Sequence, residues 1–189
     1  WCIDDPNMVD IFLSWVNGSD PEWIERRDAA AKKYNLNLSK EYINARFIER
    51  DELKWALRSI EKFTPWVHKI HLLTDKQYPN WIKRDHPKIH WVDHDTLFYP
   101  GFHSYNSEGI KFSATRVPGL SRRSIMMDDD YLFMNKVEIG DLFDSLNRTH
   151  IPIWITNKRY NYKDDIRKEQ KCDNISTDSI YNFGITLAR

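Results

Sequence analysis

The chain has 189 residues, of which 28 are basic and 28 acidic, so its formal net charge is zero. Proteins that bind polyanions usually carry a basic excess, so zero net charge argues against a nucleic-acid-binding protein. Hydrophobic residues make up 41 % of the chain, which argues against a disordered chain. No apolar run approaches the roughly 18 residues that a membrane span requires, and the length fits one domain.

The first predicted element is a strand over residues 9–16, a short run rich in β-branched and aromatic residues. Asn17-Gly18 after it is a turn signal. A helix over residues 22–34 is expected next, because Ser19 or Asp20 can cap it and a proline stands in its first turn.

The clearest helix spans residues 51–63, where apolar residues recur at helical spacing. Pro65 ends it, because the residue before a proline disfavours the helical conformation. A short helical turn is predicted over residues 78–84. Short apolar runs predict four further strands, the last at a sheet edge because it contains a proline: 69–74, 88–92, 123–127 and 151–155.

Strands alternate with helical stretches, which predicts an α/β fold with a mainly parallel sheet flanked by helices. Aspartates come after each of the first four strands, and the carboxyl ends of parallel strands meet at one edge, where α/β folds bind ligands. Each aspartate could instead serve only as a loop former or helix cap, and for Asp75 we favour that reading. The aspartates are Asp20, Asp75, Asp93 with Asp95, and Asp128–Asp130.

The strongest metal-site candidate is the run Asp128, Asp129 and Asp130. Mg²⁺ and Mn²⁺ take carboxylate oxygens, keep several waters and bridge substrate phosphates. Side chains alternate in an extended segment, so the first and third aspartates can share a face. Asp93-His94-Asp95 has the same form and is the second candidate.

No glycine-rich phosphate loop occurs, so phosphate binding would depend on arginines, backbone amides and a metal ion. Arg116 precedes the aspartate run, and Arg46 precedes the clearest helix. A guanidinium group suits bidentate phosphate contact. A surface salt bridge is the alternative for each of them.

Three segments resemble, in the same order along the chain, the conserved regions of the Stealth proteins, which are sugar-1-phosphate transferases. Residues 10–21 (DIFLSWVNGSDP) resemble the first region, and DELKWALRSIEK at 51–62 is similar to part of the second. YNS at 105–107, RVPGLS at 116–121 and DDD at 128–130 are similar to the third. We therefore expect a single catalytic-domain fragment over residues 1–189, with conserved regions at 9–20, 46–81 and 105–135 and a fourth region beyond the chain end.

The resemblance implies a nucleotide-sugar transferase core, similar to the GT-A and Rossmann-like folds and incomplete at the C-terminus. It implies transfer of a sugar-1-phosphate from a UDP-sugar to a hydroxyl of an acceptor glycan or glycoprotein, with release of UMP. Asp20, Asp129 and Asp130 would be catalytic, and Asp128–Asp130 would hold Mg²⁺ or Mn²⁺. Substrate contacts would come from Asn106, Arg116 and Arg46.

The chain departs from the family pattern at several positions. Asp128 stands where Asn is usual, Thr115 replaces a histidine, Arg50 replaces Asn, and residues 108–111 read Glu-Gly-Ile-Lys where His-Ala-Ile-Glu is usual. Two alternatives stay open, one because a D-x-D motif also suits glycosyltransferases and the other because of these departures. One is a metal-dependent glycosyltransferase that releases UDP, and the other is a non-catalytic, sugar-binding member of the family.

Four Asn-X-Ser/Thr sequons bear on the compartment: Asn17, Asn37, Asn147 and Asn174. They favour the secretory pathway, in the Golgi lumen or anchored to its membrane, and the bacterial cytoplasm is the alternative. The chain begins with Trp1 rather than Met, which predicts an excised piece with any anchor outside it. Cys2 and Cys172 are too far apart for a thiolate zinc site and form either one disulfide or two free thiols.

Overall fold

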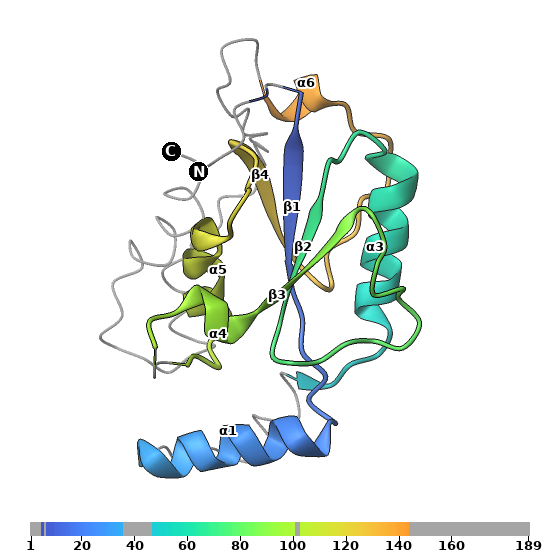
Figure 1. Ribbon diagram of the computed structural model, residues 1–189. Coiled ribbons are helices and arrows are strands. Elements are labelled where there is room, and N and C mark those ends of the chain that lie inside the picture. Colours follow the sequence, from blue (N-terminus) through green and yellow to red (C-terminus); the bar gives the residue numbers. More distant parts are fainter. Residues whose placement is uncertain (1–4, 6, 36–46, 101–102, 144–189) are drawn as a thin grey trace, which may run out of the picture. The chain divides into compact units, whose positions relative to one another are not determined.

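The computed structural model describes residues 5, 7–35, 47–100 and 103–143 (Figure 1). The chain divides into two compact units, residues 1–137 and 138–189. The sheet and its helices belong to the first unit, and helix α6 (Ile139–Leu142) belongs to the second. Within the described part of the chain, no helix is both long enough and apolar enough to cross a bilayer.

The first unit is built on a four-stranded sheet in which all neighbouring strands run parallel, in the order β3-β2-β1-β4. Leu13 on β1 pairs in register with Leu72 on β2 and Met127 on β4. The predicted α/β fold with a parallel sheet is therefore confirmed. The strands are β1 (Val9–Ser14), β2 (Ile70–Thr74), β3 (Ile89–Asp93) and β4 (Arg123–Asp128).

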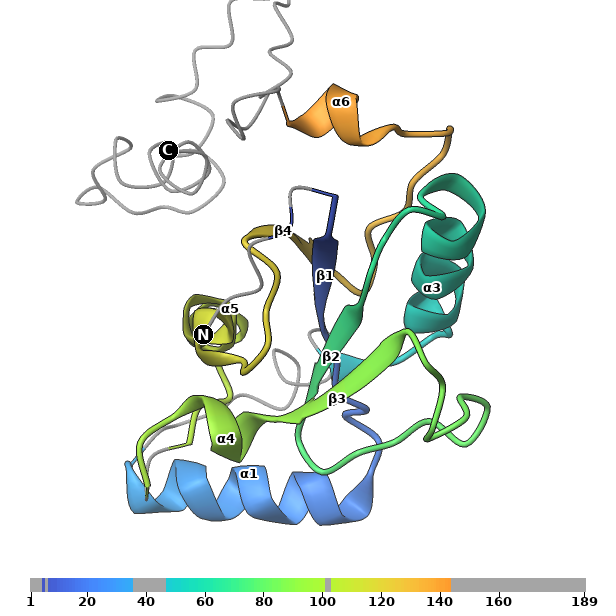
Figure 2. The same cartoon turned by 45° about the horizontal axis from the view of Figure 1, so that its top comes forward.

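Helices cover both faces of the sheet. Successive side chains of a strand point to opposite faces, so these apolar strands present apolar side chains on both. On one face, Ile11, Leu13 and Leu72 pack against α3 (Glu52–Phe63). On the other, Phe12, Leu73 and Val92 form a core with apolar side chains of α4 (His94–Leu97), α5 (Ser107–Ser113) and the 3₁₀ turn η1 (Ala114–Arg116). Figure 2 shows α3 on one side of the strands and α4 and α5 on the other.

Helix α1 (Pro21–Lys33) follows β1 after the predicted turn. Asp20 is its N-cap, since the carboxylate Oδ1 accepts a hydrogen bond of 3.0 Å from the backbone N–H of Glu22. Such a cap satisfies one of the amides that a helix start leaves unpaired. Trp23 is 1 % exposed and is the one apolar side chain that this otherwise charged helix buries.

Two expectations about local structure differ from the fold. The segment 78–84, predicted as a helical turn, contains one hydrogen-bonded turn, in which the N–H of Ile82 donates to the carbonyl of Pro79. It forms no helix, because so short a segment gains too few hydrogen bonds to offset the free-energy cost of helix nucleation. Helix α5 was not expected, since a glycine interrupts it and Ile110 is its only buried residue. The predicted strand 151–155, Cys2 and Cys172 lie outside the described residues.

Candidate functional site

A pocket of about 340 Å³ opens at the carboxyl ends of β1 and β4. Ser14, the last residue of β1, pairs in register with Asp128, the last residue of β4. The neighbouring wall comes from α5 and the residue two before its start. The lining residues are Ser14–Val16, Phe47, Ile48, Tyr105, Ser107, Glu108, Lys111 and Asp128–Tyr131. The pocket thus lies at the sheet edge where the topology predicts ligand binding.

Gly18 brings the wall segment at Phe47 close to the end of β1. Its N–H donates to the carbonyl of Phe47 at 3.0 Å. A Cβ at position 18 would lie 2.3 Å from that carbonyl oxygen, closer than side chains approach a backbone atom. The Asn17-Gly18 turn therefore shapes the pocket as well as ending the strand.

The pocket is acidic, and four of its five charged lining residues are carboxylic acids. Asp128 is paired with Lys111, whose Nζ lies 2.6 Å from Oδ1. Burial alone would lower the pKa of Lys111, but the contacts with Asp128 and Glu108 outweigh it and raise that pKa. The Lys111 ammonium therefore stays charged in the pocket.

The surroundings of Asp129 change its protonation. Burial, with the nearby charges of Asp130 and Asp128 adding to it, raises the pKa of Asp129 to about 6. A carboxyl group with a pKa this close to neutrality can exchange a proton under working conditions, and such shifts often accompany functional sites.

The predicted metal ligands Asp128, Asp129 and Asp130 all line this one pocket. Nevertheless, no three His, Cys, Asp or Glu side chains within the described ranges are arranged to hold one metal ion. With Asp128 engaged by Lys111, two of the three predicted ligands remain, Asp129 and Asp130. That donor set still fits Mg²⁺, which proteins commonly bind through one or two carboxylates together with substrate phosphates.

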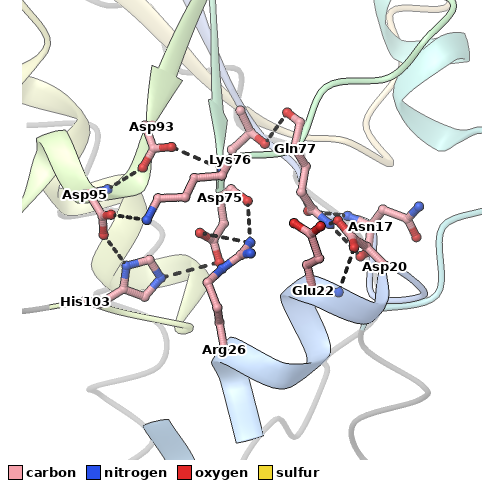
Figure 3. A network of polar contacts seen from close by, with 11 residues as sticks. Asn17, Asp20, Glu22, Arg26, Asp75, Lys76, Gln77, Asp93, Asp95 and His103 are labelled. Atoms are coloured by element: carbon pink, nitrogen blue, oxygen red, sulfur yellow. Dashed lines mark hydrogen bonds and ion pairs between the residues drawn. The ribbon is translucent and has the colours of Figure 1, made fainter. Parts of the chain in front are cut away.

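Asp20 occupies a structural position at the start of α1 (Figure 3). Its Oδ1 caps the helix, and its Oδ2 accepts a 2.8 Å hydrogen bond from Nε2 of Gln77. Gln77 also exchanges hydrogen bonds with the backbone of Asn17, at 2.8 and 2.9 Å. Asp20 is not among the residues that line the pocket. Its predicted catalytic role therefore rests on the resemblance and not on a contact in this structure.

A second group of charges lies at the carboxyl ends of β2 and β3 (Figure 3), and we call it the Asp75 network. Asp75 is fully buried, with Arg26 Nη2 at 3.5 Å and His103 Nε2 at 3.6 Å from its carboxylate oxygens. These are ion-pair distances, and neither oxygen has a hydrogen-bond donor among the residues that the structure describes. Nδ1 of His103 lies 2.7 Å from Asp95, which also pairs with Lys76 at 2.7 Å.

The second D-x-D candidate belongs to this network. Asp93 caps α4 by accepting from the N–H of Asp95 at 2.9 Å, and Asp95 is held by Lys76 and His103. Burial would raise the pKa of Asp75, but His103 and Arg26 hold it below its usual value. The contact with Asp75 raises the pKa of His103, against the effect of burial. Asp75 and Asp95 are neutralised by side-chain partners, whereas Asp93 accepts hydrogen bonds from the backbone N–H groups of Lys76 and Asp95.

Two of the three predicted substrate-binding residues, Asn106 and Arg116, are described by the structure, and neither lines the pocket. Asn106 is the N-cap of α5, where its Oδ1 accepts from the N–H of Glu108 at 3.0 Å. Arg116 donates from Nη1 to the carbonyl of Leu97 at 3.2 Å and covers the ring of Tyr99. Arg46 lies outside the described residues.

Tyr105 and Lys111 are among the lining residues that the sequence does not place in the site. Tyr105 packs against His103 at 4.6 Å between ring centroids, and burial raises its pKa to about 12, so its hydroxyl stays protonated. In the sequence, only their position near the Tyr105-Asn106-Ser107 motif could have indicated that both residues belong to the site. Placing them on the pocket wall requires α5, which the apolar pattern does not predict.

Comparison with known proteins agrees with this geometry. Residues 9–35 match the family model of Stealth protein CR1, conserved region 1, and residues 46–161 match that of Stealth protein CR2, conserved region 2. The predicted third region, 105–135, lies inside the second match. Every described residue that lines the pocket falls within these two ranges.

Curated bacterial relatives are named as polysaccharide phosphotransferases. An exopolysaccharide phosphotransferase of Streptomyces coelicolor is 35 % identical over 143 residues, which are 75 % of this chain and 24 % of the relative. The capsular polysaccharide phosphotransferases LcbA of Aeromonas hydrophila and WcwK of Streptococcus pneumoniae are 33 % and 31 % identical, over 76 % and 73 % of this chain. The chain spans 40 % and 41 % of these two relatives.

The second match alone covers more than half of the chain, and the two matches together include β1–β4 and the pocket. The chain belongs to the Stealth protein family.

Proposed function

We propose that the pocket is part of the active site of a sugar-1-phosphate transferase. An acceptor hydroxyl attacks the phosphorus that carries the donor sugar in a UDP-sugar. A new phosphorus–oxygen bond forms, the bond to UMP breaks, and UMP leaves with the bonding electrons. The acceptor oxygen loses its proton to a base. The product is a phosphodiester between the donor sugar and the acceptor.

The observation that carries this proposal is the acidic pocket at the carboxyl ends of β1 and β4, inside the segments shared with the polysaccharide phosphotransferases. Phosphoryl transfer needs neutralisation of the diphosphate and in-line placement of the reacting oxygens more than covalent help from the protein. Rigid strand ends are suited to such placement.

Asp129 and Asp130 are the proposed ligands of a Mg²⁺ or Mn²⁺ ion, which would neutralise charge on the donor diphosphate. Burial and the adjacent carboxylates raise the pKa of Asp129 because they disfavour its charged form. A bound cation would favour that charged form. Asp20 is the proposed base by resemblance. Asn106 orients the pocket wall by capping α5, and Arg116 and Arg46 remain candidates for contact with the substrate.

The proposed acceptor is a glycan hydroxyl, because the relatives are named for capsular polysaccharide and exopolysaccharide. Their bacterial origin favours the bacterial cytoplasm over the Golgi lumen as the compartment of action. Three of the four sequons lie outside the described residues, and Asn17 uses its side-chain oxygen to accept from the N–H of Ser19 at 2.9 Å.

The decisive experiment identifies the nucleotide product. The longest natural form of the protein is incubated with a UDP-sugar, an acceptor glycan and Mg²⁺ or Mn²⁺, and the nucleotides are separated by chromatography. UMP supports the proposal. UDP would instead indicate a glycosyltransferase that breaks the sugar–oxygen bond, and metal-dependent UDP-sugar binding without turnover would indicate a non-catalytic member.

A further inference from the structure

Lys111 is the single basic side chain among the described residues that line the pocket. Its ammonium nitrogen lies 2.6 Å from Oδ1 and 2.9 Å from Oδ2 of Asp128, and 3.2 Å from Oε1 of Glu108. Only 14 % of the Lys111 side chain is exposed. Water therefore screens this ion pair less than it screens a pair on the open surface.

Both partners of the pair are fixed by regular structure. Asp128 ends β4 and is held in register with Ser14 of β1. Lys111 lies on α5, which Asn106 caps and which Ile110 anchors to the core beneath the sheet. The contact between them is therefore set by the fold and not by the free motion of two long side chains.

We propose that Lys111 is a resident cation of the site, which neutralises Asp128 and keeps this carboxylate from coordinating a divalent metal ion. The inference rests on the proposed function, because it concerns the cation of that same site. Asp129 and Asp130 are then the protein ligands that remain. Two carboxylates leave most positions on Mg²⁺ or Mn²⁺ to water and to substrate phosphates.

The consequence is that the free protein holds a divalent ion weakly and gains it together with a diphosphate. A positive charge next to the site repels an incoming cation and also removes one ligand from it. Replacing Lys111 by Met keeps the apolar stem but deletes the charge. This change frees Asp128, so it should strengthen binding of a divalent ion.

A purely structural ion pair would behave differently, since its loss would lower stability without affecting metal affinity. Lys76 and Asp95 provide a matched control. Their charged atoms are 2.7 Å apart, and they lie in the Asp75 network at the carboxyl ends of β2 and β3, but neither lines the pocket.

The test is a Mn²⁺ titration of the whole chain, with free Mn²⁺ measured by electron paramagnetic resonance. Lys111→Met should bind Mn²⁺ at least about tenfold more tightly than the wild type, because a unit charge is removed from the immediate neighbourhood of a divalent ion. Lys76→Met should change the affinity less than about twofold. In the double variant Lys111→Met with Asp128→Asn the gain should disappear. Inorganic pyrophosphate should strengthen Mn²⁺ binding more in the wild type than in Lys111→Met.

Unchanged or weaker Mn²⁺ binding by Lys111→Met would overturn the inference, and so would the absence of binding in both proteins. Thermal melting checks the fold of each variant. Should Lys111→Met not fold, Lys111→Gln keeps a hydrogen-bond donor without the charge and must show the same direction of change. The proposed reaction fails separately: UDP in place of UMP as product would refute it and leave the Mn²⁺ result standing.

Discussion

The pocket and the Asp75 network contain the same kinds of charged side chain but differ in how their carboxylates are paired. Each lies at the carboxyl ends of two neighbouring strands and contains a lysine paired with an aspartate, Lys111 with Asp128 and Lys76 with Asp95. In the Asp75 network, His103 and Arg26 supply further positive charge to the carboxylates. In the pocket, Asp129 and Asp130 form no ion pair with any other described residue.

The difference shows why aspartates at strand ends do not by themselves define a site. Where arginine, histidine and lysine reach them, they fix helices α1 and α4 to the sheet edge. Where one lysine faces several acids around an open pocket, the remaining negative charge is available to a ligand. Tyr105 lies between the two regions, with its ring against His103 and its side chain in the pocket lining.

The largest expected contrast between the two regions is in catalysis. Asp130→Asn should abolish divalent-dependent turnover in the longest active form of the protein, because it removes a carboxylate from the pocket, and it should leave the fold intact because Asp130 is exposed. Asp95→Asn should lower turnover less than about threefold, since Asp95 is engaged by Lys76 and His103 outside the pocket. Initial rates with and without Mg²⁺ measure both. Equal losses of turnover in the two variants would show that the acids of the Asp75 network are needed for catalysis as much as those of the pocket.

Asp20→Asn comes next and tests the N-cap of α1, which does not line the pocket. If Asp20 is the base, turnover should fall at least about a hundredfold, because an amide cannot take the proton. The amide oxygen can still cap α1, but its NH₂ group would face Nε2 of Gln77, so a stability loss of about 1 kcal/mol is also expected. Initial rates and denaturant unfolding separate the two effects.

Asp20→Glu is the control for the catalytic part, since it keeps the carboxylate and loses the cap geometry. A near-normal rate in Asp20→Asn, with only the stability change, would restrict Asp20 to its role as a cap and in binding Gln77.

The sequence predicts the sheet because each strand is a short apolar run that an aspartate, proline or turn interrupts. It predicts the edge that carries the pocket because parallel strands place their carboxyl ends together. Helix α5 escapes prediction, since its stability comes from one buried isoleucine and from its cap at Asn106 instead of a repeating apolar face. Without α5, Lys111 and Tyr105 cannot be assigned to the pocket.

The sequence also cannot tell which carboxylates are already neutralised. Asp75 and Asp128 look alike as acids after strands, but their charged partners come from other segments of the chain. Arg26 is 49 residues before Asp75, and Lys111 is 17 residues before Asp128. Such pairings depend on three-dimensional register, which composition and spacing do not contain.

The smallest expected effects are two pH dependences of stability, one from each region. The pKa of Asp129 rises from 3.8 to about 6 on folding, so its contribution to stability is present below about pH 4 and is lost as the pH rises through about 6. At about 1.4 kcal/mol per pKa unit, the loss is at most about 3 kcal/mol, and partial exposure reduces it. Buried His94, whose pKa is lowered to about 4, acts with the opposite sign over this interval. The difference between wild type and Asp129→Asn isolates the pocket.

His103 is the source of the pH dependence of stability that we expect from the Asp75 network. Its pKa is raised on folding by the contacts with Asp75 and Asp95, so its contribution is complete below the unfolded value of 6.5 and disappears as the pH rises through the folded pKa. Deprotonation removes one of the two positive charges that face the fully buried Asp75, leaving Arg26. Denaturant unfolding at several values between pH 4 and 9, without metal, should therefore show stability falling above about pH 6.5 in the wild type and in Asp129→Asn, but not in His103→Gln. If His103→Gln kept this fall, the neutral-pH dependence would belong to another group, and the ion pair between His103 and Asp75 would contribute little to the stability of that edge.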